Sequence, residues 1–210
     1  MLPNYERTVE IASRAIRHYP WENKMAYAQF LAQTYYYVCH SIRLLAASAA
    51  RFDQKDQVLH RRFLKHAEEE NSHELIALRD LQKLGYKIED FPEFAQTKTM
   101  YEIQYFKIEH IDPVALMGYI LVLETMAGRD FKWLKEKLTP LYGKECVKFV
   151  QVHADDDPDH IVKALEIVKD LRTERLKEIN VAMEQSAICY SDMLKEATER
   201  TLGKDSKKAA

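Results

Sequence analysis

Apolar residues recur every three or four positions along most of this chain, which is the spacing of one face of an α-helix. The pattern predicts a succession of helices and no strands. A looser connection is expected from about residue 86 to 99, which contains Pro92. The expected helices cover about residues 5–18, 22–53, 57–84, 100–109, 113–138, 139–152 and 157–201.

Turn-forming residues are scarce and stand near the ends of the expected helices. The chain has only 5 glycines and 6 prolines, too few for a many-stranded sheet of this length. Gly85 is expected to cap the end of helix 57–84. Asp112-Pro113 is interpreted as the N-cap and first position of an apolar helix, and Thr139-Pro140 as the start of a short one.

No internal repeat, low-complexity segment or linker divides the chain. Because 47% of the 210 residues are hydrophobic, the chain can bury one sizeable core. The sequence therefore predicts an all-α, single-domain helical bundle over residues 1–203, followed by a disordered tail at residues 204–210.

Charges are nearly balanced, with 31 Lys and Arg against 33 Asp and Glu, so the chain has no electrostatic reason to bind nucleic acid. The longest uncharged stretch, Pro113–Leu123, is too short to cross a bilayer. Charges also precede any apolar run at the N-terminus, which is unlike a signal segment. We expect a cytoplasmic protein that binds a small molecule and neither nucleic acid nor membrane; the sequence is compatible with a homodimer.

Glu124 is the one charged residue within the apolar run VALMGYILVLETMAG. An ionised carboxylate in such surroundings destabilises the fold unless a cation or strong hydrogen-bond donors compensate it. A positive group is therefore expected opposite Glu124. A buried ion pair with a basic residue would satisfy this requirement, and so would a metal ion.

The segment HAEEENSHEL contains Glu70 and His73, three residues apart and thus about 60° apart on one side of a helix. A carboxylate and an imidazole at this spacing can bind one ion. His66 and Glu69 lie on nearby faces and are candidates for partners of the ligands, and either is an alternative ligand. Taken alone, an acidic run of this kind is typical of a solvated helix face.

The segment VQVHADDDPDHI supplies His153, Asp157 and His160, whose spacing places them on one stripe of a helix. Pro158 disfavours helical backbone at Asp157, so a helix start or a break is expected at this point. Together with Glu70, His73 and Glu124, the segment completes three carboxylates and three imidazoles. Such a set suits two iron or manganese ions rather than a closed structural zinc site.

These residues resemble the ligand signature of the haem-oxygenase-like di-iron oxidases, a family of iron-containing redox enzymes with TenA-like relatives. The resemblance lies in Glu70-x-x-His73, the isolated Glu124 and His153-x-x-x-Asp157-x-x-His160, in that order. The segments HAEEENSHELIALRDLQKLG and YAQFLAQTYYYVCHSIRLLAASAAR are also similar to that group. The resemblance covers nearly the whole chain and implies a haem-oxygenase-like, TenA-like helical bundle.

The resemblance also implies the cofactors and the reaction. Glu70, His73 and His153 would bind one iron, and Glu124, Asp157 and His160 the other, with manganese as an alternative metal. The two ferrous ions would reduce dioxygen, the co-substrate, so that a small organic substrate is oxidised. Some relatives have a glutamate seven residues before the histidine, where this chain has His66, so Glu70 is assigned instead. Thr34, Tyr37 and Ser41 are candidates for substrate contact.

Three other functions are alternatives to a di-iron oxidase. A haem oxygenase could use His18 as an axial ligand, but the chain lacks the glycine-rich helix that would cover a haem. A TenA-like hydrolase needs a cysteine nucleophile. Cys39, Cys146 and Cys189 are far apart, have no activating base nearby in sequence and are interpreted as buried thiols. A non-catalytic helical interaction protein that keeps the fold is the third alternative.

Overall fold

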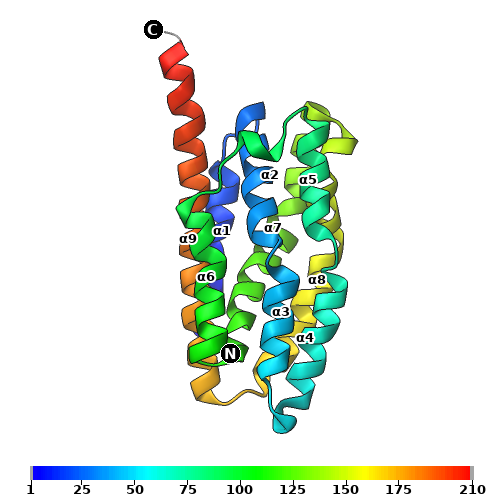
Figure 1. The fold of residues 1–210 in the computed structure, drawn as a ribbon, viewed down its shortest axis with the longest axis vertical. Helices are drawn as coiled ribbons and strands as arrows, with labels where there is room; N and C mark the ends of the chain where they lie inside the picture. The colour runs from blue at the N-terminus through cyan, green and yellow to red at the C-terminus, as the bar shows by residue number, and fades with distance from the viewer. Residues whose placement is uncertain (1, 209–210) are drawn as a thin grey trace.

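The protein is all-α, as the periodicity predicts (Figure 1). The computed structural model describes the backbone of residues 2–208 and the side chains of residues 2–155 and 161–202. Short 3-10 turns lie at Gln54–Asp56, Ile88–Asp90, Pro113–Ala115 and Lys144–Cys146. The α-helices are α1 (Tyr5–His18), α2 (Lys24–Val38), α3 (Ser41–Arg51), α4 (Gln57–Glu69), α5 (His73–Lys83), α6 (Ala95–His110), α7 (Leu116–Tyr142), α8 (Lys148–Lys169) and α9 (Thr173–Lys208).

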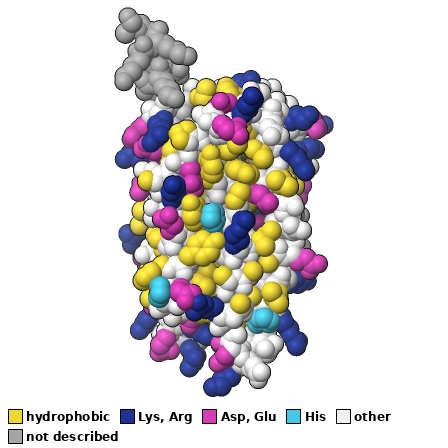
Figure 2. Space-filling model, in the orientation of Figure 1, with side chains coloured by type: hydrophobic (Ala, Val, Ile, Leu, Met, Phe, Trp, Pro, Cys, Tyr) yellow, Lys and Arg dark blue, Asp and Glu magenta, His cyan; other side chains and the backbone are white. Residues whose placement is uncertain are grey.

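The helices run along the long axis of one bundle, and α7 lies near its centre (Figure 1). It packs against α1, α8 and α9, and Leu121, Val122 and Leu134 on it are fully buried. Burial on several sides explains why the first half of this helix, residues 116–127, is apolar almost all round. Within the described residues no helix has the length and apolar character needed to cross a membrane. On the face shown in Figure 2, basic and acidic side chains are interspersed.

The close contact between α7 and α9 depends on Gly118. A methyl group built on its Cα would lie 2.2 Å from the carbonyl oxygen of Ile179 and 2.7 Å from the amide nitrogen of Met183. Both of these are backbone atoms that cannot rotate away. The absence of a side chain at this position therefore sets the distance between the two helices.

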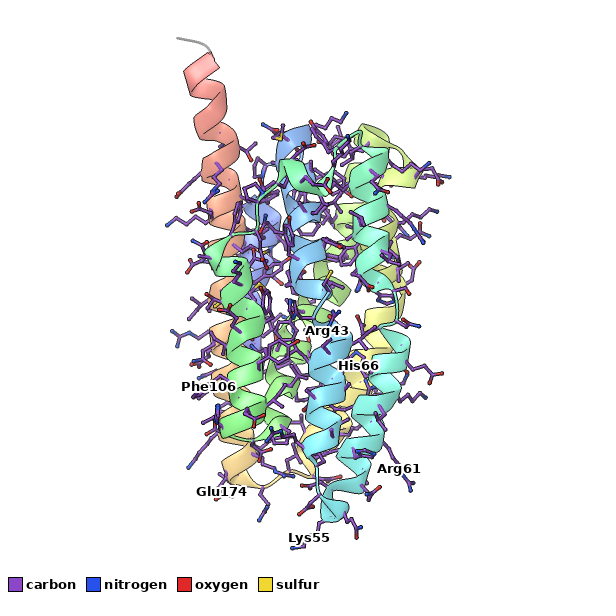
Figure 3. The ribbon with its side chains drawn as sticks, in the orientation of Figure 1. Arg43, Lys55, Arg61, His66, Phe106 and Glu174 are labelled. Atoms are coloured by element: carbon purple, nitrogen blue, oxygen red, sulfur yellow. The ribbon has the colours of Figure 1, made fainter. Side chains whose placement is uncertain are left out.

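The single helix expected over residues 22–53 is wrong, because the chain breaks between α2 and α3 at Cys39 and His40. The His40 ring stacks on Tyr101 of α6, with ring centroids 3.7 Å apart, and its Nδ1 lies 3.0 Å from the Tyr105 hydroxyl. Arg43, which Figure 3 shows at the start of α3, donates to the Cys39 carbonyl. Tertiary contacts rather than glycine or proline thus stabilise this break.

The helix expected over residues 57–84 is also two helices, α4 and α5, separated at Glu70–Ser72. Ser72 has a φ of 70°, in the left-handed region that ends a helix. The 60° spacing inferred for Glu70 and His73 on one helix is therefore wrong, although the turn still brings their side chains together. At the far end, Gly85 has a φ of 88° and follows α5, as the sequence predicts.

The later helix boundaries differ from the prediction at two points. The expected helix start at Thr139-Pro140 is wrong, because α7 continues through Pro140 to Tyr142 and ends at Gly143, where φ is 84°. The expected helix from about 157 to 201 is wrong as well, because α8 spans Lys148–Lys169 and α9 begins at Thr173. The guanidinium of Arg175 donates hydrogen bonds to Asp56 and Asp112, and these bonds connect the start of α9 to the turns before α4 and α7.

Asp112 caps the turn before α7. Its carboxylate accepts a hydrogen bond of 2.9 Å from the Val114 amide, as predicted.

The tail expected at residues 204–210 falls outside the part of the chain whose side chains are described, although α9 itself extends to Lys208.

Asp80 of α5 joins that helix to the start of α8. Its carboxylate accepts a hydrogen bond of 2.8 Å from the Phe149 amide, one of the donors at a helix N-terminus that lack an intrahelical partner. The Asp80 side chain is almost completely buried. Burial raises the pKa of Asp80 to about 7, against the opposing effect of the backbone donors of Phe149 and Lys148.

We expect this buried carboxyl to make folding stability fall as pH rises from about 5 to 8. The folded-state pKa lies above the unfolded value, so the stabilising contribution is fully present below the unfolded pKa and is lost as pH rises through about 7. Asp80→Asn keeps an oxygen acceptor and removes the titration. Urea unfolding should show the variant gaining about 2–4 kcal/mol on the wild type between pH 5 and pH 8. An unchanged difference between the two pH values would contradict the assignment.

Candidate metal centre

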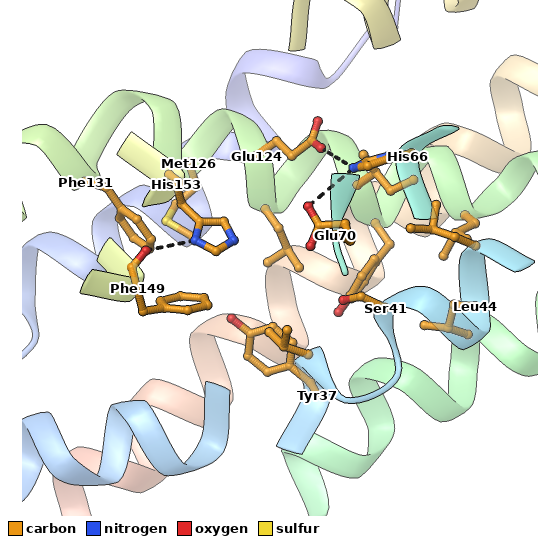
Figure 4. A pocket seen from close by; sticks show the side chains of 17 residues that line it. Tyr37, Ser41, Leu44, His66, Glu70, Glu124, Met126, Phe131, Phe149 and His153 are labelled. Carbon is orange, nitrogen blue, oxygen red and sulfur yellow. Dashed lines mark hydrogen bonds and ion pairs between the residues drawn. The ribbon is translucent and has the colours of Figure 1, made fainter. Parts of the chain in front are cut away.

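Five carboxylate and imidazole side chains converge inside the bundle from three separate parts of the sequence, and Figure 4 shows His66, Glu70, Glu124 and His153 among them. His66 lies on α4, Glu70 follows its last residue and His73 begins α5. Glu124 comes from α7 and His153 from α8. The break between α4 and α5 directs Glu70 and His73 toward the same point, since the turn replaces the helical path between them.

The first cluster consists of His66, Glu70 and Glu124. The His66 Nε2 atom lies 2.9 Å from Glu124 Oε1 and 3.6 Å from Glu70 Oε1. The three side chains are close to fully buried, with 5% of His66, 12% of Glu70 and 9% of Glu124 exposed. The positive group required opposite Glu124 is therefore His66 in this structure.

The second cluster consists of Glu70, His73 and His153. The His73 Nδ1 atom lies 3.4 Å from Glu70 Oε2, and the His73 and His153 ring centroids are 5.0 Å apart. In each cluster the three candidate ligand atoms lie within 4.8 Å of one another. Because Glu70 belongs to both clusters, its two oxygens join them into one site.

Charge within the site is tightly coupled. Burial lowers the pKa of His66, but hydrogen bonding to Glu124 and Glu70 outweighs it and raises the pKa to about 9. Burial opposes ionisation of Glu70, yet hydrogen bonds with His66 and His73 hold the pKa of Glu70 well below its usual range. Burial lowers the pKa of His153, so this imidazole stays neutral. A neutral imidazole is the form that binds a metal ion.

The orientation of His153 fits metal binding. Its Nδ1 lies 2.9 Å from the carbonyl oxygen of Phe149, so in the neutral ring Nδ1 carries the proton and donates it. The Nε2 lone pair is then available as a ligand. A backbone carbonyl that fixes the tautomer in this way is common behind metal-binding histidines. Together with two carboxylates and two further imidazoles, the residues fit a site for first-row transition metals.

The other residues that the sequence predicts as metal ligands, their partners or substrate contacts lie partly inside and partly outside the described site. Asp157 and His160 lie outside the residues whose side chains are described. Glu69 forms ion pairs with Arg62 at 3.2 Å and with Lys163 at 3.9 Å, beside the two clusters rather than within them. Thr34 is fully buried on α2 but does not line the pocket at the centre, whereas Tyr37 and Ser41 do.

A pocket with an empty volume of about 640 Å³, including the part open to solvent, adjoins the two clusters. His66, Glu70, Glu124 and His153 form the titratable part of its wall, and mostly apolar side chains of α2, α3, α7 and α8 form the rest of the described lining. The break between α2 and α3 contributes to it, because Tyr37 and Ser41 lie on either side of that break. Sequence periodicity did not reveal this pocket, since its apolar residues follow the same pattern as ordinary core residues.

The residues that other functions would need lie away from the pocket. His18 is exposed on α1, and its ring nitrogen contacts the Arg14 carbonyl. None of Cys39, Cys146 and Cys189 lines the pocket, and burial raises the pKa of all three thiols. A nucleophilic cysteine needs the opposite shift.

Residues 28–191 match the sequence model of a family described as iron-containing redox enzymes. This match spans most of the chain, and the protein belongs to that family. No curated protein matches the chain.

Solved structures agree on the fold. A protein of unknown function from Shewanella denitrificans with a haem-oxygenase-like fold aligns with a TM-score of 0.81 at 21% identity, covering 93% of this chain and 90% of that one. A TenA homologue from Pseudomonas syringae aligns with a TM-score of 0.75 at 14% identity, covering 91% of each chain. A TenA homologue from Pyrococcus furiosus gives a TM-score of 0.74 at 11% identity, covering 92% and 99%. The fold is thus haem-oxygenase-like and TenA-like.

Proposed function

We propose that this member of the iron-containing redox enzymes is a non-haem di-iron oxidase or oxygenase that uses dioxygen to oxidise a small organic substrate. The observation that carries the proposal is the pair of three-residue clusters, one buried and the other partly buried, that share Glu70. A single ion pair would need one carboxylate and one base, whereas this site gathers two carboxylates and three imidazoles. Such a donor set suits iron, with manganese as an alternative.

The described residues divide between two ions in this proposal. His66, Glu70 and Glu124 would hold one, and Glu70, His73 and His153 the other. Asp157 and His160, the two further ligands expected from the sequence, remain candidates that would complete the set. Two ferrous ions would supply the electrons with which dioxygen is reduced.

The chain's own residues prepare the site for this chemistry. The two glutamates offset the charge of the ions, and the neutral His153 presents Nε2 because Phe149 holds its other nitrogen. His66 must release its proton before it can bind metal, since without metal its pKa is about 9. Apolar walls limit the access of bulk water to the reacting groups.

We expect the purified full chain to bind about two iron ions after anaerobic addition of ferrous ion. Iron quantification after desalting measures the stoichiometry, and an oxygen electrode then measures consumption of dioxygen. The proposal predicts loss of metal-dependent oxygen uptake in Glu124→Ala, with helicity by circular dichroism largely retained. A chain that binds no iron under these conditions would favour a non-catalytic interaction protein, and a chain with full uptake in that variant would contradict the ligand assignment.

The TenA-like hydrolase is the alternative that the structural neighbours raise. It is less well supported because no cysteine lines the pocket and because burial raises the pKa of each thiol. Retention of activity on a hydrolysable substrate after removal of all iron would favour that alternative.

A further inference from the structure

The pocket beside the proposed iron centre is elongated. Its wall on α7 extends from Leu116 to Phe131, a distance of about 22 Å along a helix that rises 1.5 Å per residue. Glu124 stands between these two ends of the wall. A slender ligand could therefore extend past the metal centre rather than end at it.

Among the described residues that line the pocket, charge belongs to the proposed metal ligands. Those that carry charge or titrate near neutral pH are His66, Glu70, Glu124 and His153, and none of the described ones is Lys or Arg. A charged group placed away from the centre would lose its hydration without gaining a partner. The part of a ligand that extends along the pocket is therefore uncharged.

Tyr119 adds one hydrogen-bonding group to this apolar wall. Its side chain is 5% exposed, and its hydroxyl is buried with no hydrogen-bond partner among the described residues. Burial, together with the nearby Tyr37 and Glu70, holds the pKa of Tyr119 well above its usual value, so the phenol keeps its proton. A buried hydroxyl without a partner destabilises a protein. Its position on a pocket wall indicates that a ligand supplies the missing acceptor.

We propose that Tyr119 is a specificity-determining residue whose hydroxyl donates a hydrogen bond to a neutral oxygen of a slender, otherwise apolar substrate such as a ketone, aldehyde, ether or alcohol. Because Tyr119 and Glu70 line the same pocket, the oxygen-bearing end would lie in the part of the pocket that adjoins the metal centre. The catalytic meaning of this contact rests on the proposed function, but the binding itself requires only the pocket.

Tyr190 provides a matched control. Its hydroxyl is also buried without a hydrogen-bond partner in the described structure, and its ring packs edge-on against Tyr37, with centroids 6.4 Å apart. Unlike Tyr119, it does not line the pocket. Tyr190→Phe therefore removes the same chemical group from the same region without touching the ligand.

The test uses 2-octanone as the probe and the full chain, both without added metal and after anaerobic addition of ferrous ion. Calorimetry measures the Kd, and infrared spectroscopy measures the carbonyl stretch of the bound ketone. We expect Tyr119→Phe to weaken binding about fivefold to tenfold, the loss of one hydrogen bond, and Tyr190→Phe to change it less than twofold. The bound carbonyl should absorb at lower frequency in the wild type and Tyr190→Phe, but not in Tyr119→Phe.

Several outcomes would overturn the proposal. These are absence of ketone binding to the wild type, equal affinity in the two variants, or an unshifted carbonyl in the wild type. An unshifted carbonyl in the wild type would mean that the Tyr119 hydroxyl does not donate to the ketone, and this result is decisive even if Tyr119→Phe does not fold. Ketone binding without iron uptake would leave the inference about Tyr119 standing while the proposed function fails, so the two failures are distinguishable.

Discussion

Replacing Glu70 with glutamine is expected to remove both iron ions and to lower dioxygen-dependent oxidation at least about 10³-fold. Glu70 is the residue that the two clusters share, so one substitution affects both proposed ions. An amide has nearly the same shape as the carboxylate but no negative charge to offset two divalent cations. Iron per chain and oxygen uptake measure the effect.

Glu68 offers a control within the same acidic run, because it is an exposed carboxylate two residues earlier. Glu68→Gln removes the same charge and should keep about two irons per chain. His73→Ala changes only the cluster that contains His153, so it should lose less iron than Glu70→Gln. Normal iron content in Glu70→Gln would show that Glu70 is not a shared ligand.

Gly118→Ala is expected to give the largest loss of stability, about 3 kcal/mol or more. The added methyl would meet the Ile179 carbonyl oxygen at 2.2 Å and the Met183 amide nitrogen at 2.7 Å. Relief requires α7 and α9 to move apart, because neither backbone atom can rotate away. Urea unfolding followed by circular dichroism measures the change in the free energy of unfolding. A variant that does not fold would also agree with the prediction.

Gly143→Ala separates the effect of steric contact from that of backbone conformation. Gly143 has a φ of 84°, but an added methyl would find nothing within 4 Å. Only the backbone is then strained, because φ of 84° with ψ of 154° is a conformation that almost only glycine adopts, and this costs about 1–3 kcal/mol. A Gly118 variant as stable as the Gly143 variant would contradict the close contact assigned to α7 and α9.

The class of fold could be predicted from the sequence, whereas several helix breaks could not. Periodicity and scarce glycine indicated an all-α bundle, and Asp112-Pro113 and Gly85 marked real boundaries. The break at His40 depends on contacts with Tyr101 and Tyr105, more than 60 residues away. Local sequence carries no information on such contacts. Pro140 gives the opposite error, because the sequence predicts a helix start there and α7 continues through it. A helix can include a proline when its surroundings stabilise the helix.

Only part of the candidate site could be predicted from the sequence. Glu124 was found because a carboxylate stood out within an apolar run, and the structure places it close to Glu70. The sequence indicates His66 only as a partner of the ligands or an alternative ligand, although its Nε2 atom lies 2.9 Å from Glu124 Oε1. Spacing within one helix cannot show which residue of another helix it faces. Tyr119 carried no signal at all, because a tyrosine in an apolar helix is usually a packing residue.

The order of the site residues along the chain also constrains when the centre can form. His66 and His153 lie 87 residues apart in the sequence (153 − 66), and Glu124 belongs to the central helix of the bundle. A nascent polypeptide that has produced only α4 and α5 holds no more than three of the five groups. Metal capture should therefore follow the docking of α8, so iron would enter a chain that is already largely folded and would stabilise it at a late stage of maturation.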